Sequence, residues 1–483
     1  MSLHVIGRKK KKKFKAIVIG GGPVGMYFTH ALQETGIDYV LCEKRDSIPP
    51  PTAFGLFLWP HGLRLLHQVG LIDQTEAISS SLTKIIHVGP EGDVVRDYSD
   101  FGFIQLAHGY PVRMFDRASL GKMLYDTLRA PEAHIRTRKQ LIDIERRAGG
   151  VAATFADGTR EEGSIIIGAD GIWSKVRDLM RRDAPEGLFA ENPYVAGYRA
   201  VFGRAPIPRH QRDTSSTNHL LQPERQVEFY RDGALLQLFT SKREVHFISY
   251  LKLDRPRRER RGFSTDIDAT DDAIAPWLDT RVAQDVTFRD LWQTKAIAGG
   301  ANLDEGVVRM WHWGRMVLVG DAAHKVLPNQ GMGANGGIES AASLVNQLSA
   351  LLRHEREPGA AELRQAFAAY QAERQGVMAA YRRMARDELD GWTRSGGAGG
   401  PLLDALRVMN GLVSPMVARA VRLDAVPFPE ERSGFAPWVY KVPAEAAMAA
   451  GVDRNCEEES RRQWINIAAC CSLVMLPRSW PRY

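Results

Sequence analysis

The sequence predicts an α/β protein: a Rossmann-like nucleotide-binding domain with an inserted antiparallel-sheet domain and a helical C-terminal region. Three observations lead to this fold class. A glycine-rich turn joins a buried strand to a helix near the N-terminus, a second glycine-rich loop follows residues 316–319, and hydrophobic residues alternate between residues 195 and 253. A chain of 483 residues is also long for one core, so we expect two or three domains.

The composition is that of an ordinary globular protein, with 44% hydrophobic and 25% charged residues. The formal net charge is +7, and Arg8, Lys9–Lys13 and Lys15 supply as many positive charges. The basic balance therefore belongs to an N-terminal arm, residues 1–13, and no nucleic-acid partner is expected. A nuclear-import signal or a contact with an anionic surface is one interpretation of this arm, and a solvated tail is the simpler one.

Neither the cysteines nor the apolar segments indicate a secreted or membrane-spanning protein. Cys42, Cys456, Cys470 and Cys471 form no spaced framework, and no apolar signal-peptide core precedes the first strand. The apolar segment Ile465–Leu476 is shorter than the ~20 residues that a spanning helix needs. We expect an intracellular, cytoplasmic protein, and weak membrane association through the C-terminal region stays open.

The first glycine-rich turn predicts a nucleotide site. The apolar run Phe14–Ile19 is typical of a buried parallel strand, and a helix is expected over Met26–Glu34. Between them lie Gly20, Gly22 and Gly25 in the spacing G-x-G-x-x-G. The first glycine permits a tight turn, the second lets the backbone approach a pyrophosphate, and the third allows close helix packing.

An acidic residue follows this turn at the expected distance. The second strand, Tyr39–Cys42, ends at Glu43, about 20 residues after the last glycine, where a ribose-binding acid belongs. The pattern indicates recognition of adenosine diphosphate but does not separate FAD from NAD. The alternative is a glycine turn of a βαβ unit that binds no nucleotide.

The second glycine-rich loop favours a flavin. The strand Met316–Val319 should bring Asp321 to the carboxyl end of the sheet, and a helix is expected to begin near Met332–Asn335. Gly331 and Gly333 keep the approach to the helix N-terminus open. An acid at a strand end and a positive helix start suit the hydroxylated chain of FAD and a ring that becomes anionic on reduction. No spacing of histidine, cysteine and acidic residues predicts a metal site.

These residues also carry a family resemblance. The run Gly320–Glu339, preceded by Trp311–Arg315, resembles the second flavin motif of aromatic-hydroxylase-like, single-component (group A) FAD monooxygenases. It is similar in particular to the fungal branch that modifies prenylated secondary metabolites. Gly168–Gly171 resembles the Asp-Gly motif of the same family, which serves the flavin and the nicotinamide cofactor. The resemblance covers roughly residues 14–350.

The resemblance implies which residues hold the cofactor. Arg117, before a helix expected over Ala118–Arg129, matches the arginine that contacts FAD in the family, and Phe57 stands where the family commonly has a glycine. The implied cofactor contacts are Gly20, Gly22, Gly25, Glu43, Phe57, Arg117, Asp170, Asp321, Pro328, Gly331, Gly333, Ala334 and Asn335. His324 lies beside them, where a structural role is favoured over that of a base.

The middle of the chain predicts the substrate side. The expected antiparallel strands are Gly197–Gly203, Val227–Tyr230, Leu235–Thr240 and Val245–Leu251. One face of this sheet should cover the flavin and hold the substrate. Arg199 and Tyr230 resemble paired catalytic pocket residues that orient a phenolate in some relatives. A charge at the sheet edge and a half-buried strand aromatic are the alternative interpretations.

The expected segments are an arm (1–13), the FAD-binding domain in three parts (14–78, 112–190, 300–355), a substrate-domain hairpin (79–111), the antiparallel-sheet substrate domain (191–299) and a helical C-terminal region (356–483). Two further local structures are expected. Ala152–Phe155 and Ser164–Ile167 should form a hairpin, and residues 254–271 an exposed connection.

The resemblance implies a monooxygenase that uses NADPH or NADH as co-substrate. It would insert one oxygen atom of O2 into a lipophilic small molecule through a C4a-hydroperoxide of the flavin. Epoxidation of a prenyl alkene is expected in preference to hydroxylation of a phenol. Arg199 and Tyr230 would matter for the hydroxylation. The rivals are a flavin halogenase, whose Trp-x-Trp-x-Ile-Pro signature Trp311–Arg315 does not match, and a non-catalytic FAD-binding scaffold. The sequence indicates no oligomeric state.

Overall fold

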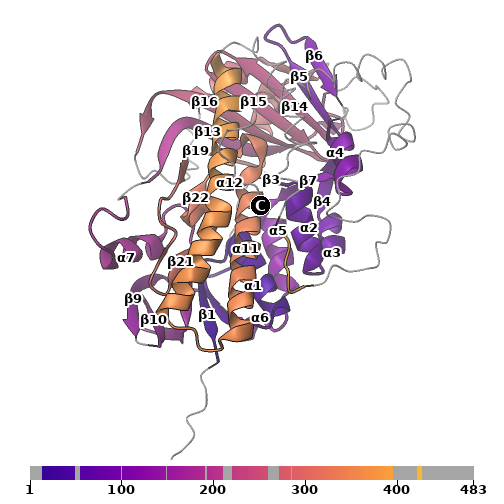
Figure 1. The fold of residues 1–483 in the computed structure, drawn as a ribbon. Coiled ribbons are helices and arrows are strands. Elements are labelled where there is room, and N and C mark those ends of the chain that lie inside the picture. The colour runs from indigo at the N-terminus through magenta and orange to yellow at the C-terminus, as the bar shows by residue number, and fades with distance from the viewer. Residues whose placement is uncertain are drawn as a thin grey trace, which may run out of the picture.

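The computed structural model describes residues 13–48, 55–98, 100–147, 149–190, 193–209, 220–258, 271–283, 285–394 and 421–426. The basic arm apart from Lys13, the three C-terminal cysteines and the segment Ile465–Leu476 lie outside these residues. Two large sheets form the molecule, with a small sheet between them and a long helix beside both (Figure 1). The predicted α/β fold class is confirmed.

The first large sheet contains the two predicted cofactor strands. Its six strands lie in the order β20-β21-β12-β1-β2-β8. They are β1 (Lys15–Ile19), β2 (Asp38–Cys42), β8 (Ile135–Arg136), β12 (Ile165–Gly168), β20 (His312–Trp313) and β21 (Met316–Leu318). All pairings are parallel except that of β20 with β21. Apolar side chains bury both faces of the central strands, as expected of a parallel sheet covered by helices.

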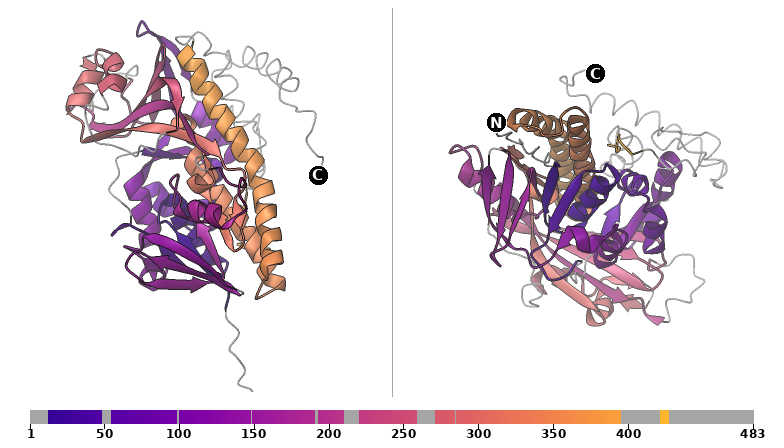
Figure 2. Two further views of the ribbon diagram at one scale, coloured as in Figure 1. Left: turned by 90° about the vertical axis from the view of Figure 1, so that its left-hand side faces the viewer. Right: turned by 90° about the horizontal axis from the view of Figure 1, so that it is seen from below.

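The helices pack around this sheet and hold it to the rest of the molecule. They include α1 (Pro23–Glu34), α2 (Pro60–Gln68), α3 (Ile72–Ala77), α4 (Asp100–His108), α5 (Arg117–Asp126), α6 (Pro131–His134), α7 (Lys175–Asp183), α11 (Met332–His354) and α12 (Ala360–Arg394). Helix α12 runs along the side of the molecule past both large sheets (Figure 2). None of the described helices is long and apolar enough to cross a bilayer. The cytoplasmic location stays a prediction.

Two small sheets complete this part and correct one expectation. One has the order β3-β7-β4, with β3 (Gly55–Leu58), β7 (Val112–Asp116) and β4 (Ser79–Leu82). In the other, β10 (Gly150–Phe155) pairs with β9 (Leu141–Arg147) and β11 (Arg160–Gly163). The expected hairpin with Ser164–Ile167 is therefore wrong. Those residues enter the parallel sheet as β12, where Ile165, Ile166 and Ile167 are buried.

The second large sheet contains all four of the predicted antiparallel strands. Its order is β22-β19-β13-β16-β15-β14-β5-β6. The strands are β5 (Lys84–Val88), β6 (Val94–Tyr98), β13 (Val195–Pro206), β14 (Arg225–Arg231), β15 (Ala234–Thr240), β16 (Glu244–Arg257), β19 (Ile297–Val307) and β22 (His324–Lys325).

The boundaries of the second sheet differ from the expected segments. The boundary expected after residue 299 falls inside β19, which pairs with β13 as far as Glu305. The segment 79–111 supplies β5 and β6 to this sheet, but β4 pairs with β7, and the helix α4 was not expected. Strand β16 continues to Arg257, so the connection expected over 254–271 begins later, and residues 259–270 lie outside the described chain.

The two faces of the second sheet have different neighbours. On one face Val201, Phe229 and Phe247 pack with Trp277 and Phe288. The covering elements are α9 (Asp271–Ile274), the 3-10 turn η1 (Ala275–Trp277), β17 (Arg281–Ala283), β18 (Val286–Thr287) and α10 (Phe288–Gln293). The other face, with Ala200, Tyr230, Leu235 and Tyr250, joins the core of the cofactor domain. We call it the inner face.

Candidate active site

The first glycine turn has the geometry of an anion site at a helix start. Gly20 has φ +110°, and a Cβ there would lie 2.4 Å from the carbonyl oxygen of Ala169, so only glycine fits. Gly22 is the N-cap of α1, without a side-chain cap, and a Cβ there would meet no atom within 4 Å. Unobstructed backbone N–H groups at a helix N-terminus favour a phosphate.

Glu43 connects the end of β2 to this turn. Its carboxylate is 4% exposed and accepts the N–H of Gly21 at 2.7 Å through Oε2 and the N–H of Arg45 at 2.9 Å through Oε1. A carboxylate has about four acceptor positions. Glu43 can therefore accept ribose hydroxyls while it also orders the glycine turn.

Asp170 lies at the same edge of the parallel sheet, just after β12. Its Oδ2 accepts the N–H of Val176 at 3.1 Å, whereas Oδ1 is buried and has no hydrogen-bond partner. Burial raises the pKa of this carboxyl group. An unpartnered buried acceptor at a strand end suits a hydroxyl donor of a ligand.

Asp321 and Arg117 carry opposite charges that interact. Asp321 follows β21 and Gly320, its side chain is one-third exposed, and Lys325 donates to its Oδ2 at 2.5 Å. The Arg117 side chain is exposed at the start of α5, the surrounding protein lowers the pKa of its guanidinium by desolvation, and the charge of Asp321 opposes that shift. An acid and an arginine whose charges interact are close enough to hold parts of the same ligand.

The second glycine loop follows as two tight turns, η2 (Gly320–Ala322) and η3 (Pro328–Gln330). Gly331 has φ +67° and is the N-cap of α11, with no side-chain cap and no acid in the first turn. A Cβ at Gly333 would meet only Val326, at 3.8 Å, and Ala334 is partly buried. The helix start is therefore uncovered and positive, as predicted.

Asn335 acts differently from the expectation of a direct cofactor contact. Its Nδ2 donates to the carbonyl oxygens of Phe57 (2.9 Å) and Gly331 (2.7 Å), and its Oδ1 accepts the N–H of Trp59 at 3.0 Å. Trp59 in turn donates from Nε1 to the carbonyl of Gln330 at 2.9 Å. The fully buried amide thus ties β3 to the cofactor loop.

Phe57 lies where the cofactor loop meets the antiparallel sheet. A Cβ at Gly331 would lie 2.9 Å from the Phe57 Cβ. The Phe57 ring contacts the ring of Phe239 on β15, with centroids 4.4 Å apart. Phe57 is therefore one wall between the cofactor loop and the inner face.

The expectation that Arg199 and Tyr230 form one pocket pair is wrong. Residues that are paired across neighbouring strands lie on the same face of the sheet. Tyr230 pairs with Leu235, Leu235 with Tyr250, and Tyr250 with Ala200. The neighbouring row runs from Arg231 through Ala234 and Leu251 to Arg199. Neighbouring residues in a strand point to opposite faces. Tyr230 is therefore on the inner face, and Arg199 is on the other one, with two strands between their own strands.

Tyr230 belongs to a buried polar cluster that was not foreseen. Its hydroxyl donates to Glu228 Oε2 at 2.7 Å and also contacts Nδ1 of His87. Its ring stacks on Trp392 of α12, with centroids 4.0 Å apart. The tyrosine hydroxyl is thus engaged by protein groups. The signal in the sequence was the run of polar residues at alternate positions of this strand, Gln226, Glu228 and Tyr230.

A second set of bonds joins this cluster to the cofactor loop. Gln237 donates from Nε2 to Glu228 Oε1 at 2.7 Å and to the carbonyl oxygen of Asn329 at 3.3 Å. Asn329 donates from Nδ2 to Glu388 of α12 at 2.7 Å. The inner face, the loop and α12 are therefore joined by hydrogen bonds.

The structural interpretation of His324 is confirmed. The ring is 1% exposed, its Nε2 lies 2.9 Å from Ser340 Oγ, and burial lowers its pKa to about 3. Among the described residues, no group of three histidine, cysteine or acidic side chains could hold a metal ion.

The chain matches the family described as FAD binding domain over residues 13–385. It is 34% identical over 379 residues to the FAD-dependent monooxygenase srdH of Neurospora crassa, covering 75% of this chain and 82% of that protein. It is also 34% identical over 354 residues to the FAD-dependent monooxygenase spyC of Aspergillus fumigatus, covering 71% of each.

Two solved structures show the same fold. A salicylate hydroxylase substrate complex has a TM-score of 0.65 at 20% identity and covers 86% of this chain and 99% of its own. HpxO of Klebsiella pneumoniae complexed with FAD and uric acid has a TM-score of 0.62 at 22% identity, covering 82% and 92%. The open glycine turn, the unpartnered Asp170 oxygen and Arg117 near Asp321 all fit FAD. With these matches, the chain belongs to the FAD-dependent monooxygenases and is a FAD-binding oxidoreductase, and it shares the fold of the two solved structures.

Proposed function

We propose that this enzyme inserts one oxygen atom of O2 into a lipophilic small molecule bound between the cofactor loop and the inner face, with NADPH or NADH as the reductant. The observation that carries the proposal is the contact of a FAD-type loop with the inner face, which is made in part by aromatic side chains. Phe57 and Phe239 make that contact, and the bond from Gln237 to Asn329 reinforces it. A substrate between them would be shielded from water.

The chain would hold FAD largely through backbone N–H groups at helix starts and through acidic side chains. The turn that Gly20 and Gly25 shape would hold the pyrophosphate at the start of α1, with the open approach at Gly22, and Glu43 would hold the adenosine ribose. FAD supplies the redox chemistry that activates O2. The positive N-terminus of α11, from Gly331 onward, would stabilise negative charge on the reduced ring.

Two acids and Arg117 would orient the rest of the cofactor. Asp321 would accept hydroxyls of the ribityl chain, and the unpartnered Oδ1 of Asp170 would accept a further donor. Arg117, whose charge interacts with that of Asp321, would also contact the cofactor. Pro328 and Ala334 would border the ring at the two ends of the loop, with Phe57 beside them.

For the reaction we favour epoxidation of a prenyl-type alkene over hydroxylation of a phenol. Hydroxylation would require a pair of polar side chains that orient a phenolate. Arg199, however, is on the face opposite the inner face, and the Tyr230 hydroxyl is engaged with Glu228 and His87. Transfer to an alkene requires no protein base. The fungal relatives support a role in secondary metabolism.

Labelled dioxygen tests the proposal. FAD-loaded enzyme, NADPH and a geranylated phenol are incubated under ¹⁸O₂, and the product is analysed by mass spectrometry. The expected product has one labelled oxygen on the prenyl chain, and Tyr230→Phe retains most of the turnover. A label on the aromatic ring together with a severe rate loss in Tyr230→Phe would establish aromatic hydroxylation instead. NADPH oxidation that no lipophilic compound stimulates would contradict the monooxygenase proposal.

A further inference from the structure

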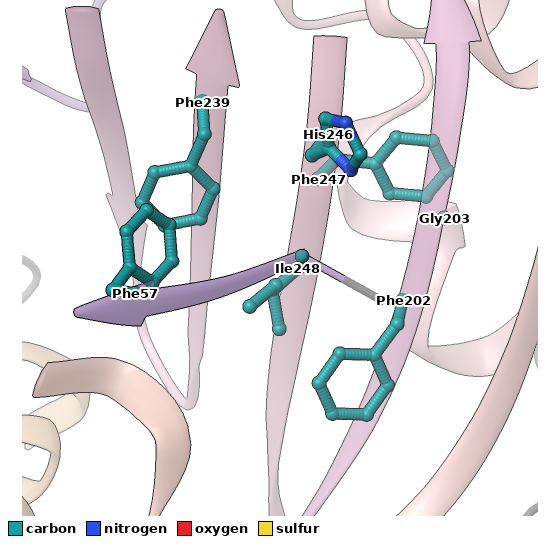
Figure 3. A pocket seen from close by; sticks show the side chains of 8 residues that line it. Phe57, Phe202, Gly203, Phe239, His246, Phe247 and Ile248 are labelled. Atoms are coloured by element: carbon teal, nitrogen blue, oxygen red, sulfur yellow. The ribbon is translucent and has the colours of Figure 1, made fainter. Parts of the chain in front are cut away.

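A small pocket lies between β3 and the inner face, beside the proposed reaction site (Figure 3). Its lining consists of Gly55, Phe57, Phe202, Gly203, Phe239, His246, Phe247 and Ile248. Phenylalanine rings and an isoleucine supply most of the surface. His246 is the one side chain in this lining that can form a hydrogen bond.

His246 has an unused hydrogen-bonding atom. Its side chain is 6% exposed, and Nδ1 is buried with no hydrogen-bond partner. Buried polar atoms are almost always paired in folded proteins, because an unpaired one loses its bond to water without replacement. An unpaired nitrogen at the wall of a pocket therefore indicates a bond that a ligand completes.

The backbone opposite places no side chain over this nitrogen. Gly55 faces His246, and a Cβ at Gly55 would lie 3.5 Å from Nδ1, which is ordinary van der Waals contact. An alanine methyl group would therefore cover the nitrogen without a clash. With glycine, residue 55 places nothing between Nδ1 and the pocket.

The imidazole is also uncharged at neutral pH. Burial lowers its pKa, the charge of Arg204 lowers it further, and Glu244 and Asp116 oppose the shift. A neutral ring accepts from a hydroxyl or donates to a carbonyl, depending on its tautomer. It offers no charge to attract a carboxylate, and the aromatic walls offer none either.

The pocket lies next to the cofactor loop. Phe57 is a wall of the pocket and packs against Gly331, the N-cap of α11. Phe239, whose ring contacts that of Phe57, is on β15 one position beyond Leu238 and two beyond Gln237, whose side chain reaches Asn329 of the loop. A molecule whose reacting part lies at the loop can therefore extend one end into the pocket.

We propose that this pocket, whose volume of about 10 Å³ has room for one water-sized group, receives a single uncharged oxygen at one end of the substrate, and that His246 Nδ1 forms the hydrogen bond that selects it. The inference rests on the proposed function, because it takes the inner face as the substrate side. It adds a specificity residue and excludes carboxylates at this end of the substrate.

Calorimetric titration of the FAD-loaded enzyme tests the subsite without turnover. Three matched probes are used: 4-geranylphenol, geranylbenzene, which lacks the oxygen, and 4-geranylbenzoate, which is charged. The variants are His246→Phe, which removes the nitrogen, and Gly55→Ala, which covers it. Gly376→Ala is the control, because a Cβ at this α12 glycine meets nothing within 4 Å. FAD content and circular dichroism check the fold of each variant.

The wild-type enzyme and the control should bind the phenol about three- to tenfold more tightly than the hydrocarbon, the range for one hydrogen bond. The benzoate should bind most weakly. In both test variants the phenol should bind no better than the hydrocarbon. The proposal is overturned if the preference survives in either folded variant, if the benzoate binds most tightly, or if none of the probes binds.

The two proposals can fail separately. Probe binding with the expected preference but without oxygen transfer in the labelled-dioxygen experiment would leave the subsite standing and remove the proposed reaction. Oxygen transfer by the wild-type enzyme, together with a preference for the phenol that His246→Phe and Gly55→Ala both retain, would leave the proposed reaction standing and remove the subsite.

Discussion

The parallel sheet and the antiparallel sheet prepare their binding surfaces in different ways. At the parallel sheet, glycines and helix starts present the backbone, and single acids at strand ends supply the side chains. At the antiparallel sheet, side chains from two strands and α12 meet across long sequence distances in the Tyr230–Glu228–His87–Trp392 cluster. Cofactor binding is therefore sensitive to backbone geometry, and substrate binding to side-chain identity.

The largest expected effect is at the backbone of the first turn. Gly20→Val should abolish FAD retention, because its Cβ would lie 2.4 Å from a backbone oxygen and its φ is +110°. The strain alone costs about 1–3 kcal/mol, and the overlap adds to it. The measurement is the FAD-to-protein ratio after gel filtration. Gly376→Ala is the control, and full FAD content in the valine variant would show that this turn does not hold the cofactor.

Asp321→Ala should weaken FAD binding less, by about 1–3 kcal/mol, because one acceptor for ribityl hydroxyls is lost while the backbone stays in place. Lys325 would lose its partner, but it is partly exposed and water can replace the bond. Flavin fluorescence during dialysis measures the affinity. Asp321→Asn keeps an acceptor oxygen and should retain more of it. Unchanged affinity in both variants would refute the role of this acid.

Asp304 on β19 should produce a pH effect on stability rather than on the cofactor. Burial raises its pKa to about 6 from the usual 3.8, with Lys325 opposing the shift, and its Oδ1 has no partner. Between pH 3.8 and about pH 6, the Asp304 carboxyl group keeps its proton in the folded chain and releases it in the unfolded chain. Stability should therefore fall as the pH rises from 4 to 6, by about 3 kcal/mol once both forms are ionised.

Asp304→Asn should remove that loss. Its Tm should exceed that of the wild-type enzyme at pH 8 by a few degrees and match it near pH 4. Asp93→Asn, on the exposed turn between β5 and β6, is the control. An equal Tm difference at both pH values would show that ionisation of Asp304 is not the cause.

The expectations held where the pattern was local and failed where it depended on register. The strand–glycine–helix units around Gly20 and Gly331 were predicted because each needs only a few consecutive residues. The strand Ile165–Gly168 was assigned to a hairpin, because an apolar run of four residues fits a hairpin and a parallel sheet equally well. Arg199 and Tyr230 form a pair only by resemblance to pocket residues of relatives, and that resemblance says nothing of the face on which each side chain lies in this chain.

By itself the sequence determined the α/β class, the cofactor-binding turns and the membership of a flavoprotein family, since glycine conformations and strand-to-helix transitions are encoded within short stretches. Only the tertiary structure decided what lies on the inner face: the engaged hydroxyl of Tyr230, the bond from Gln237 to the cofactor loop and the open Nδ1 of His246. The reason is that strand order and register determine which distant side chains meet, and a shift of one residue would move every one of them to the other face.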